Sequence, residues 1–169
     1  MIIPNGLERE AWEINNPALG AYMLWVFTIS AYKKNKTPIH PCKLFLLFPF
    51  IFYSDTRDVL ISSRGGMQAY VSKFSSVKMC ASDIPLSIHL RVDTQKSRTL
   101  DSLIVALDLG IIHLNKDSGM VTPNLDIKPI PVINLEENTK ELSGCAKKLG
   151  DWLSDLTPSD LTKIIKVVF

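Results

Sequence analysis

The side chains of this 169-residue chain best suited to bind a metal ion or to act as nucleophiles are its three histidines and three cysteines. These residues are His40, His89, His113, Cys42, Cys80 and Cys145. Only His40 and Cys42 are close in sequence, whereas zinc sites use paired ligands at regular spacing. We therefore expect no metal site. A cysteine–histidine nucleophile pair stays open as an alternative, because its members need only meet in space.

A second candidate site is the segment Ser63-Arg64-Gly65-Gly66, which precedes an expected helix. Backbone amides and a guanidinium in such a place could hold an anion. The segment lacks the Gly-Lys-Ser/Thr of a P-loop, so a turn between helices is the favoured interpretation. The aspartates of the chain form no recognisable catalytic pair and are expected on a solvated surface. We assign no catalytic residue and no cofactor.

The clearest local pattern is a helix followed by a β-hairpin between Ser97 and Pro123. Ser97 or Thr99 is expected to cap the helix, and Gly110 to close it as a left-handed residue. Two short β-prone runs, at 111–114 and 120–122, flank a polar loop that ends in glycine, which is typical of a hairpin. A helix followed by a hairpin is the later half of a winged helix.

Basic side chains around this unit are the candidate contacts with nucleic acid or a protein partner. They are Arg91, Lys96 and Arg98 before the helix and Lys116 at the hairpin tip. A winged helix presents such groups to phosphates. The expected recognition helix, however, carries Asp101 and Asp108 and no Lys or Arg, whereas a DNA-reading helix normally presents basic or amide side chains. This pattern favours protein contact, with DNA contact as the alternative.

Helical patterns occupy most of the remaining chain. The expected helices run from Pro17 to about 36, over 41–53 with a kink or end at Pro49, over 67–74, over 86–98, over 136–156 after an Asn134 cap, and from 157 onward. The alternation in 86–98 also permits a strand. The predicted fold class is therefore mainly α with a small β-hairpin, a winged-helix-like helical domain. The simplest division is a single domain over 1–169, with a winged-helix-like portion at 83–123 and C-terminal helices at 135–169.

The bulk composition suits a folded chain with its own core. Charged residues make up 21%, the apolar set 46%, and the net charge is +2, which by itself favours neither nucleic acid nor membrane. The apolar stretches 17–32 and 44–53 are shorter than the roughly 20 residues of a membrane-spanning helix. The start of the chain does not have a signal-peptide pattern. An odd number of widely spaced cysteines indicates reduced thiols, so we expect a cytoplasmic protein.

Several segments together resemble one family. They are Asn16-Pro17-Ala18-Leu19, Leu44-Phe45-Leu46-Leu47-Phe48-Pro49 with Thr56-Arg57 after it, Thr99-Leu100-Asp101-Ser102-Leu103 running into Leu109-Gly110-Ile111-Ile112, and Ala146-Lys147-Lys148-Leu149-Gly150-Asp151-Trp152-Leu153. In this order they resemble the middle component of bacterial three-component ABC systems, the conflict systems that include Lamassu-type antiphage defence.

The resemblance implies a small, winged-helix-like accessory protein without catalytic residues or cofactor. Its expected partners are an SMC/Rad50-like ABC ATPase that senses DNA and an effector that is often a nuclease. The middle component would bridge the two and help to hold the effector inactive, in defence against phages or plasmids. DNA would be reached through the complex, and no membrane is involved. A stand-alone winged-helix DNA-binding regulator and a cysteine-dependent enzyme are the competing hypotheses.

Overall fold

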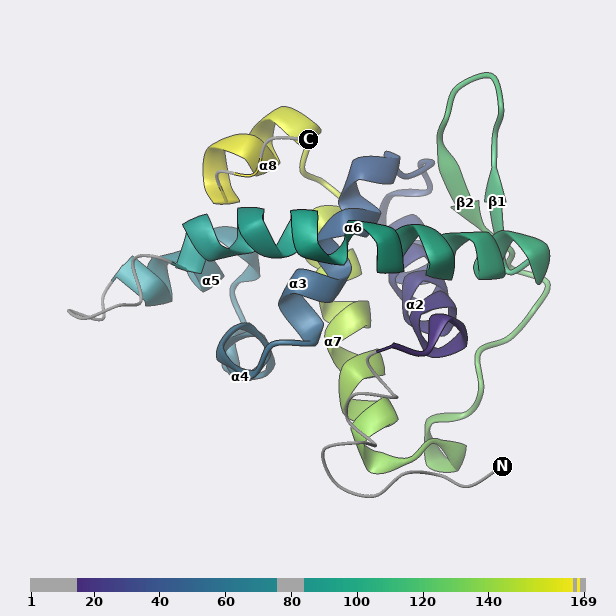
Figure 1. Ribbon diagram of the computed structural model, residues 1–169, viewed down its shortest axis with the longest axis horizontal. Coiled ribbons are helices and arrows are strands. Elements are labelled where there is room, and N and C mark those ends of the chain that lie inside the picture. The colour runs from purple at the N-terminus through teal and green to yellow at the C-terminus, as the bar shows by residue number, and fades with distance from the viewer. Residues whose placement is uncertain (1–14, 76–83, 166, 168–169) are drawn as a thin grey trace.

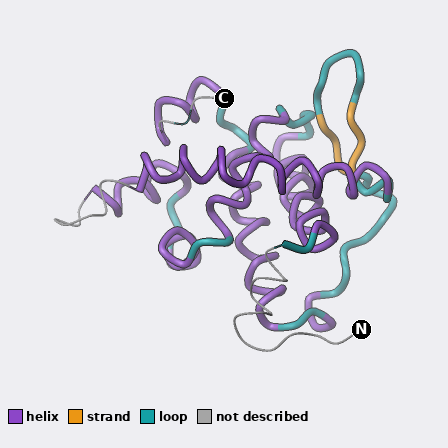
Figure 2. Tube along the Cα trace, in the orientation of Figure 1, coloured by secondary structure: helices purple, strands orange, loops and turns teal. Residues whose placement is uncertain are grey.

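The computed structural model describes residues 15–75, 84–165 and 167, and it is mainly helical with one small antiparallel hairpin (Figures 1 and 2). The α-helices are α2 (Pro17–Asn35), α3 (Leu47–Ile51), α4 (Ser54–Ser62), α5 (Gly66–Ser75), α6 (Ile84–Asp108), α7 (Glu137–Leu153) and α8 (Pro158–Ile165). Two 3-10 helices, η1 (Pro41–Leu46) and η3 (Val132–Asn134), and two strands, β1 (Ile112–Leu114) and β2 (Val121–Pro123), complete the described elements. The predicted class, mainly α with a small hairpin, is confirmed.

Helix α2 is the centre of the molecule. Asn16 caps it, because its side-chain oxygen accepts hydrogen bonds from the amides of Ala18 and Leu19, and Pro17 occupies the first helical position. Apart from the partly covered Tyr22, every residue from Gly20 to Ala31 is buried. Helices α6 and α7 make the most extensive contacts with it. A helix that is apolar nearly all round needs such cover on several sides.

Two glycines set how closely these helices approach one another. A Cβ atom at Gly20 would overlap the hydroxyl group of Ser102 on α6, and a Cβ atom at Gly150 on α7 would overlap the carbonyl oxygen of Phe27 on α2. The Gly150 contact is with backbone, which cannot turn aside as a flexible side chain can. The backbones of α2 and α7 therefore pack at a distance that only glycine allows at this position.

Polar groups close the same interface at its end. The carbonyl oxygen of Ser154, just after α7, accepts hydrogen bonds from Asn35 Nδ2 at 3.0 Å and from Lys43 Nζ at 3.1 Å. The carbonyl oxygen of Asp151 accepts one from Lys34 Nζ at 2.9 Å. The last carbonyls of a helix have no partner within the helix, so these side chains satisfy the C-terminal end of α7.

The hairpin is attached to the core by a residue far from it in sequence. Strands β1 and β2 pair in antiparallel register, with His113 opposite Thr122. On the other side of β2, Val121 forms a bridge with Ile39: the Ile39 amide donates to the Val121 carbonyl at 2.7 Å, and the Val121 amide donates to the Ile39 carbonyl at 2.9 Å. The connection between α2 and η1 thus supplies a third extended segment. Gly110 adopts the predicted left-handed conformation, with φ 64°.

Two predicted helix starts are wrong. Neither Ser97 nor Thr99 caps a helix, because α6 continues through both for 25 residues. The hydroxyl of Thr99 is buried and donates back to the carbonyl of Gln95, and no glycine or proline interrupts the helix between 86 and 108. Asn134 is not a cap either, since it ends η3, and α7 starts at Glu137.

Two glycines of α7 provide a matched test of the close packing. We expect Gly150→Ala to lower the free energy of unfolding by roughly 2 kcal/mol, because the added methyl overlaps the Phe27 carbonyl. Gly144 lies on the same helix with nothing near its Cβ position, so Gly144→Ala should raise stability by about 0.5 to 1 kcal/mol. Urea unfolding of the two variants measures both changes. Equal effects would contradict the packing argument.

Candidate functional site

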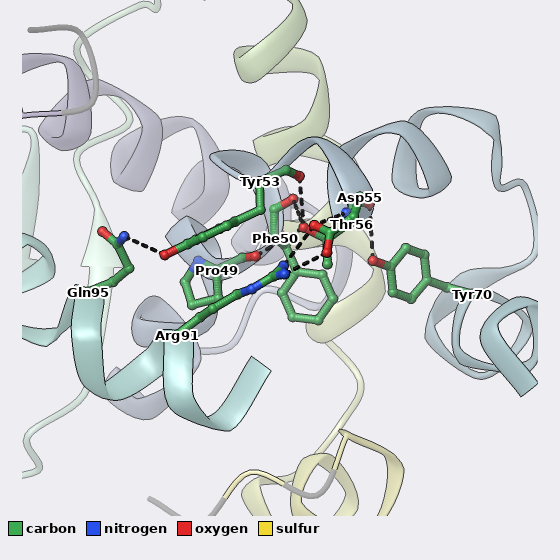
Figure 3. A network of polar contacts seen from close by, with 8 residues as sticks. All are labelled: Pro49, Phe50, Tyr53, Asp55, Thr56, Tyr70, Arg91 and Gln95. Carbon is green, nitrogen blue, oxygen red and sulfur yellow. Dashed lines mark hydrogen bonds and ion pairs between the residues drawn. The ribbon is translucent and has the colours of Figure 1, made fainter. Parts of the chain in front are cut away.

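Helix α6 is held in place by a cluster of polar and aromatic side chains at the start of α4 (Figure 3). The Arg91 guanidinium donates to both carboxylate oxygens of Asp55, at 2.9 and 2.5 Å, and lies 4.1 Å from the centre of the Tyr53 ring. The Tyr53 hydroxyl accepts a hydrogen bond from Gln95 Nε2 at 3.0 Å, one turn further along α6. A forked ion pair combined with a cation–π contact fixes both the position and the rotation of α6.

A buried hydroxyl completes this cluster. Thr56 is fully buried, and its single hydroxyl proton is shared among three carbonyls within reach, those of Pro49 and Phe50 in α3 and of Tyr53 just before α4. The Tyr70 hydroxyl donates to the Thr56 carbonyl at 3.0 Å. Burial raises the pKa of Tyr70, so this group remains a protonated donor. The contacts join α3, α4, α5 and α6 around one polar centre.

The four basic residues predicted as contacts therefore fall into two kinds. Arg91 is used internally, and Arg98 donates to Gln95 Oε1 at 2.7 Å and to Asn15 Oδ1 at 2.5 Å. Lys96 and Lys116 are exposed and make no hydrogen bond or ion pair with the described residues. They lie on different elements, because Lys96 is on α6 and Lys116 is in the loop between β1 and β2. Two of the four side chains are therefore bound within the molecule, and the other two are exposed on separate elements.

The outer face of α6 has a different character. Leu90, Leu100 and Ile104 are 67%, 41% and 56% exposed, although large apolar side chains on a helix usually face a core. The opposite face, against α2, buries the polar side chains Thr99 and Ser102. Three exposed carboxylates share the outer face with the apolar residues: Asp93, Asp101 and Asp108. Helix α6 runs across the front of the molecule in Figure 1, with no described element over this side.

Sequence reasoning missed this surface because the helical spacing of Leu100 and Ile104 predicts a helix but does not show which of its faces is exposed. The signal that could have revealed it is the row of small and polar residues on the other side, at Gln95, Thr99, Ser102 and Ala106, which recurs at the same helical period. Small residues let α6 approach α2 closely at Gly20. Leu90, Leu100 and Ile104 lie on the opposite, exposed side of the helix.

A second exposed apolar segment runs between β2 and α7. Its apolar residues are Leu125, Ile127, Ile130, Val132 and Ile133, the last of which is 90% exposed. Asn124 anchors its start, since Asn124 Nδ2 donates to the Gly110 carbonyl at 2.8 Å and the Asn124 carbonyl accepts from Trp25 Nε1 at 3.4 Å. We call residues 125–133 the strap. It descends from the hairpin base toward the start of α7, away from the middle of α6 (Figure 2).

Of the described cysteines and histidines, His40, Cys42 and His89 line one pocket between η1 and α6, whereas Cys145 and His113 are not part of it. Cys42 is buried, burial raises the pKa of its thiol, and its amide donates to His40 Nδ1 at 3.3 Å. Burial likewise raises the pKa of Cys145 to about 11. Both thiols are therefore protonated and poorly nucleophilic. Cys80 lies outside the described residues. Among those that are described, no three His, Cys, Asp or Glu side chains are grouped so that they could hold a metal ion.

The molecule is thus a small helical protein whose most distinctive described features are surfaces suited to other macromolecules. Comparison with protein families identifies which kind. The family model described as ABC-three component (ABC-3C) system Middle Component 3 matches residues 5–169. The chain belongs to this family, so it is an accessory component of a multi-component system. No curated protein and no solved structure matches the chain significantly. Across the described residues, none of the helices has the length and apolar character needed to cross a membrane.

The contacts of Arg91 with Asp55 and Tyr53 predict that part of the free energy of unfolding depends on pH. Arg91→Ala should lower the free energy of unfolding at pH 7 by roughly 1 to 2 kcal/mol, because it removes the ion pair and the contact with Tyr53. The hydrogen bonds from Arg91 lower the pKa of Asp55. These hydrogen bonds therefore stabilise the fold fully above the pKa of about 3.9 that the Asp55 carboxyl has in the unfolded chain. Their contribution is lost as the pH falls through the lower pKa that Asp55 has in the folded chain.

Chemical denaturation of wild type and Arg91→Ala across this pH range measures the effect. The stability difference should be constant between about pH 5 and 7 and should shrink below about pH 4. Lys96→Ala is the matched control on the same helix and should change stability by less than about 0.5 kcal/mol. A difference between wild type and Arg91→Ala that does not depend on pH would contradict a role for the Asp55 pair.

Proposed function

We propose that this protein is a non-catalytic bridging subunit that links an SMC/Rad50-like ABC ATPase to an effector, most simply a nuclease, and regulates that effector. The setting is a cytoplasmic defence complex of the Lamassu type, directed against phages or plasmids. Membership of the ABC-three component middle component family supports an accessory role. The particular partners follow from the family resemblance in the sequence.

The observation that carries the proposal is the presence of separate exposed apolar surfaces on one small chain. The outer face of α6 exposes Leu90, Leu100 and Ile104, and the strap exposes a second set that ends at Ile133. Exposed apolar patches commonly mark protein interfaces. A subunit that bridges two proteins must offer both of them a surface at the same time, and the α6 face and the strap meet that need.

Direct DNA binding is the second candidate, supported by the exposed Lys116 at the hairpin tip and Lys96 on α6. In a winged helix these positions lie near the duplex. The outer face of α6, however, presents Asp101 and Asp108, and carboxylates repel the phosphate backbone. Protein contact is therefore the better-supported use of α6.

Co-expression with the products of the neighbouring genes tests the bridging role. We expect the chain to purify in one complex with both the ATPase and the effector. Ile133→Asp should detach one of these partners and leave the other bound, because it places a charge in the strap without disturbing the core. Gln68→Asp, an exposed change on α5, should leave the complex intact. A chain that binds neither partner would refute the bridging function.

A mobility-shift assay with duplex DNA at low salt tests the second candidate. The isolated chain should give no shift, because the acidic outer face of α6 opposes phosphate. If a shift does occur, it should weaken with added salt, and it should weaken again in Lys96→Ala and Lys116→Ala. Such a result would favour the DNA-binding regulator over the bridging subunit.

A further inference from the structure

We infer that the outer face of α6, from Leu90 to Ile104, binds an amphipathic helix of a partner protein, and that this helix carries basic residues along its flanks. The inference rests on the proposed function and deepens it, because it names the docking surface and the chemistry of the segment that occupies it.

The spacing of the exposed residues on α6 is that of one helix packed along another. Leu90, Ser97 and Ile104 recur every seven residues, and Asp93 and Leu100 occupy the intermediate positions of the same heptad frame. Such a seam accepts the side chains of a second helix between its own. From Leu90 to Ile104 it extends about 21 Å, since each helical residue advances about 1.5 Å. The partner segment therefore needs about four helical turns.

A pocket lies at the Leu90 end of the seam, where η1 meets α6. Its volume is about 440 Å³ and its apolar lining includes Phe45, Leu90 and Val92. Pockets of this size accommodate a drug-sized group, so a large aromatic or aliphatic side chain fits. Interfaces commonly gain most of their affinity from a few side chains that fill such pockets. The pocket provides the anchor point for one end of the partner helix.

The charges on this face select the partner. Asp93, Asp101 and Asp108 are exposed and form no ion pair with the described residues, whereas Lys96 beside the pocket is the one exposed lysine of the described part of α6. A helix with Lys or Arg beside its own seam would bring cations near Asp93 within the seam, near Asp101 at its edge and near Asp108 one turn beyond Ile104. Charge complementarity of this kind steers association and suppresses wrong partners.

The same charges disfavour a second copy of this chain. Two copies of α6 packed face to face would bring Asp93, Asp101 and Asp108 of both chains to one interface, and the antiparallel register that matches Leu90 with Ile104 would set Asp93 against Asp101. Like charges on facing helices are destabilising. A basic helix from another protein satisfies the apolar and the charged positions together.

Designed peptides test the inference without knowledge of the natural partner. The probe is a fluorescent peptide of about three heptads, with Leu and Ile in its seam and Lys at the flanking positions. The matched peptide has Glu in place of each Lys. Fluorescence anisotropy with the full chain should show binding of the Lys peptide, weakening with salt, and at least about 10-fold weaker binding of the Glu peptide.

Variants of the chain locate the binding surface. Leu100→Asp and Ile104→Asp should each weaken binding of the Lys peptide by about 10-fold or more. Ile133→Asp makes the same chemical change at an exposed strap residue and should leave peptide binding unchanged. Thermal melts check that all three variants remain folded, which we expect because each position is solvent-exposed.

Several results would overturn the inference: no binding of the Lys peptide, equal binding of both peptides, or equal binding by Ile104→Asp and wild type. A chain that dimerises in light scattering, with the dimer lost in Ile104→Asp, would assign the face to a second copy instead. Duplex DNA that binds and is lost in the same variants would assign it to nucleic acid. The proposed bridging function has its own test: it would be wrong if the chain bound neither co-expressed partner, even if the peptides bound as expected.

Discussion

The close contact of α2 with its two neighbouring helices is the constraint on which the rest of the structure depends. Gly150 lets the α7 backbone lie against the Phe27 carbonyl, and Gly20 makes room for Ser102 of α6. Helices at this distance leave no space for large side chains between them. On α6 the facing positions are accordingly small or polar, and the larger Leu100 and Ile104 are turned toward solvent. The packing of the core thus creates the exposed surface that suits a partner.

The polar cluster at the start of α4 sets the rotation of α6 and so decides which residues this surface shows. Arg91 is held between Asp55 and Tyr53, and Gln95 binds the same tyrosine from the next turn. Holding Arg91 internally also removes its charge from the surface. Arg98 is likewise bonded to Gln95 and Asn15. Two of the four basic residues that a DNA-binding role would use are therefore engaged within the molecule, whereas the carboxylates of the outer face remain exposed.

Membership of the ABC-three component middle component family and the physical character of the surface point in the same direction. The described thiols are buried and protonated, and the exposed features are apolar residues next to carboxylates. Under the proposed bridging function, the α6 face and the strap would each supply a surface for one partner.

Local patterns were enough to predict much of the fold. The helix that begins at Pro17, the left-handed Gly110 and the hairpin after it all follow from interactions between residues near in sequence. The family resemblance also came from short ordered segments and agrees with the family match. The predicted caps at Ser97 and Asn134 were wrong, because a hydroxyl or amide next to a helical pattern caps only where the chain leaves the helix. The winged-helix interpretation and the division at residue 83 stay predictions.

Contacts between distant residues decided what the local patterns could not. The bridge of Ile39 to Val121, the pairing of Arg91 with Asp55, and the outward turn of Leu100 and Ile104 each depend on a partner many residues away. A helical pattern has two sides, and which one is buried depends on the shape of the helix packed against it. On α6, Ser102 fits against Gly20 of α2, whereas Leu100 and Ile104 lie on the exposed side of the helix.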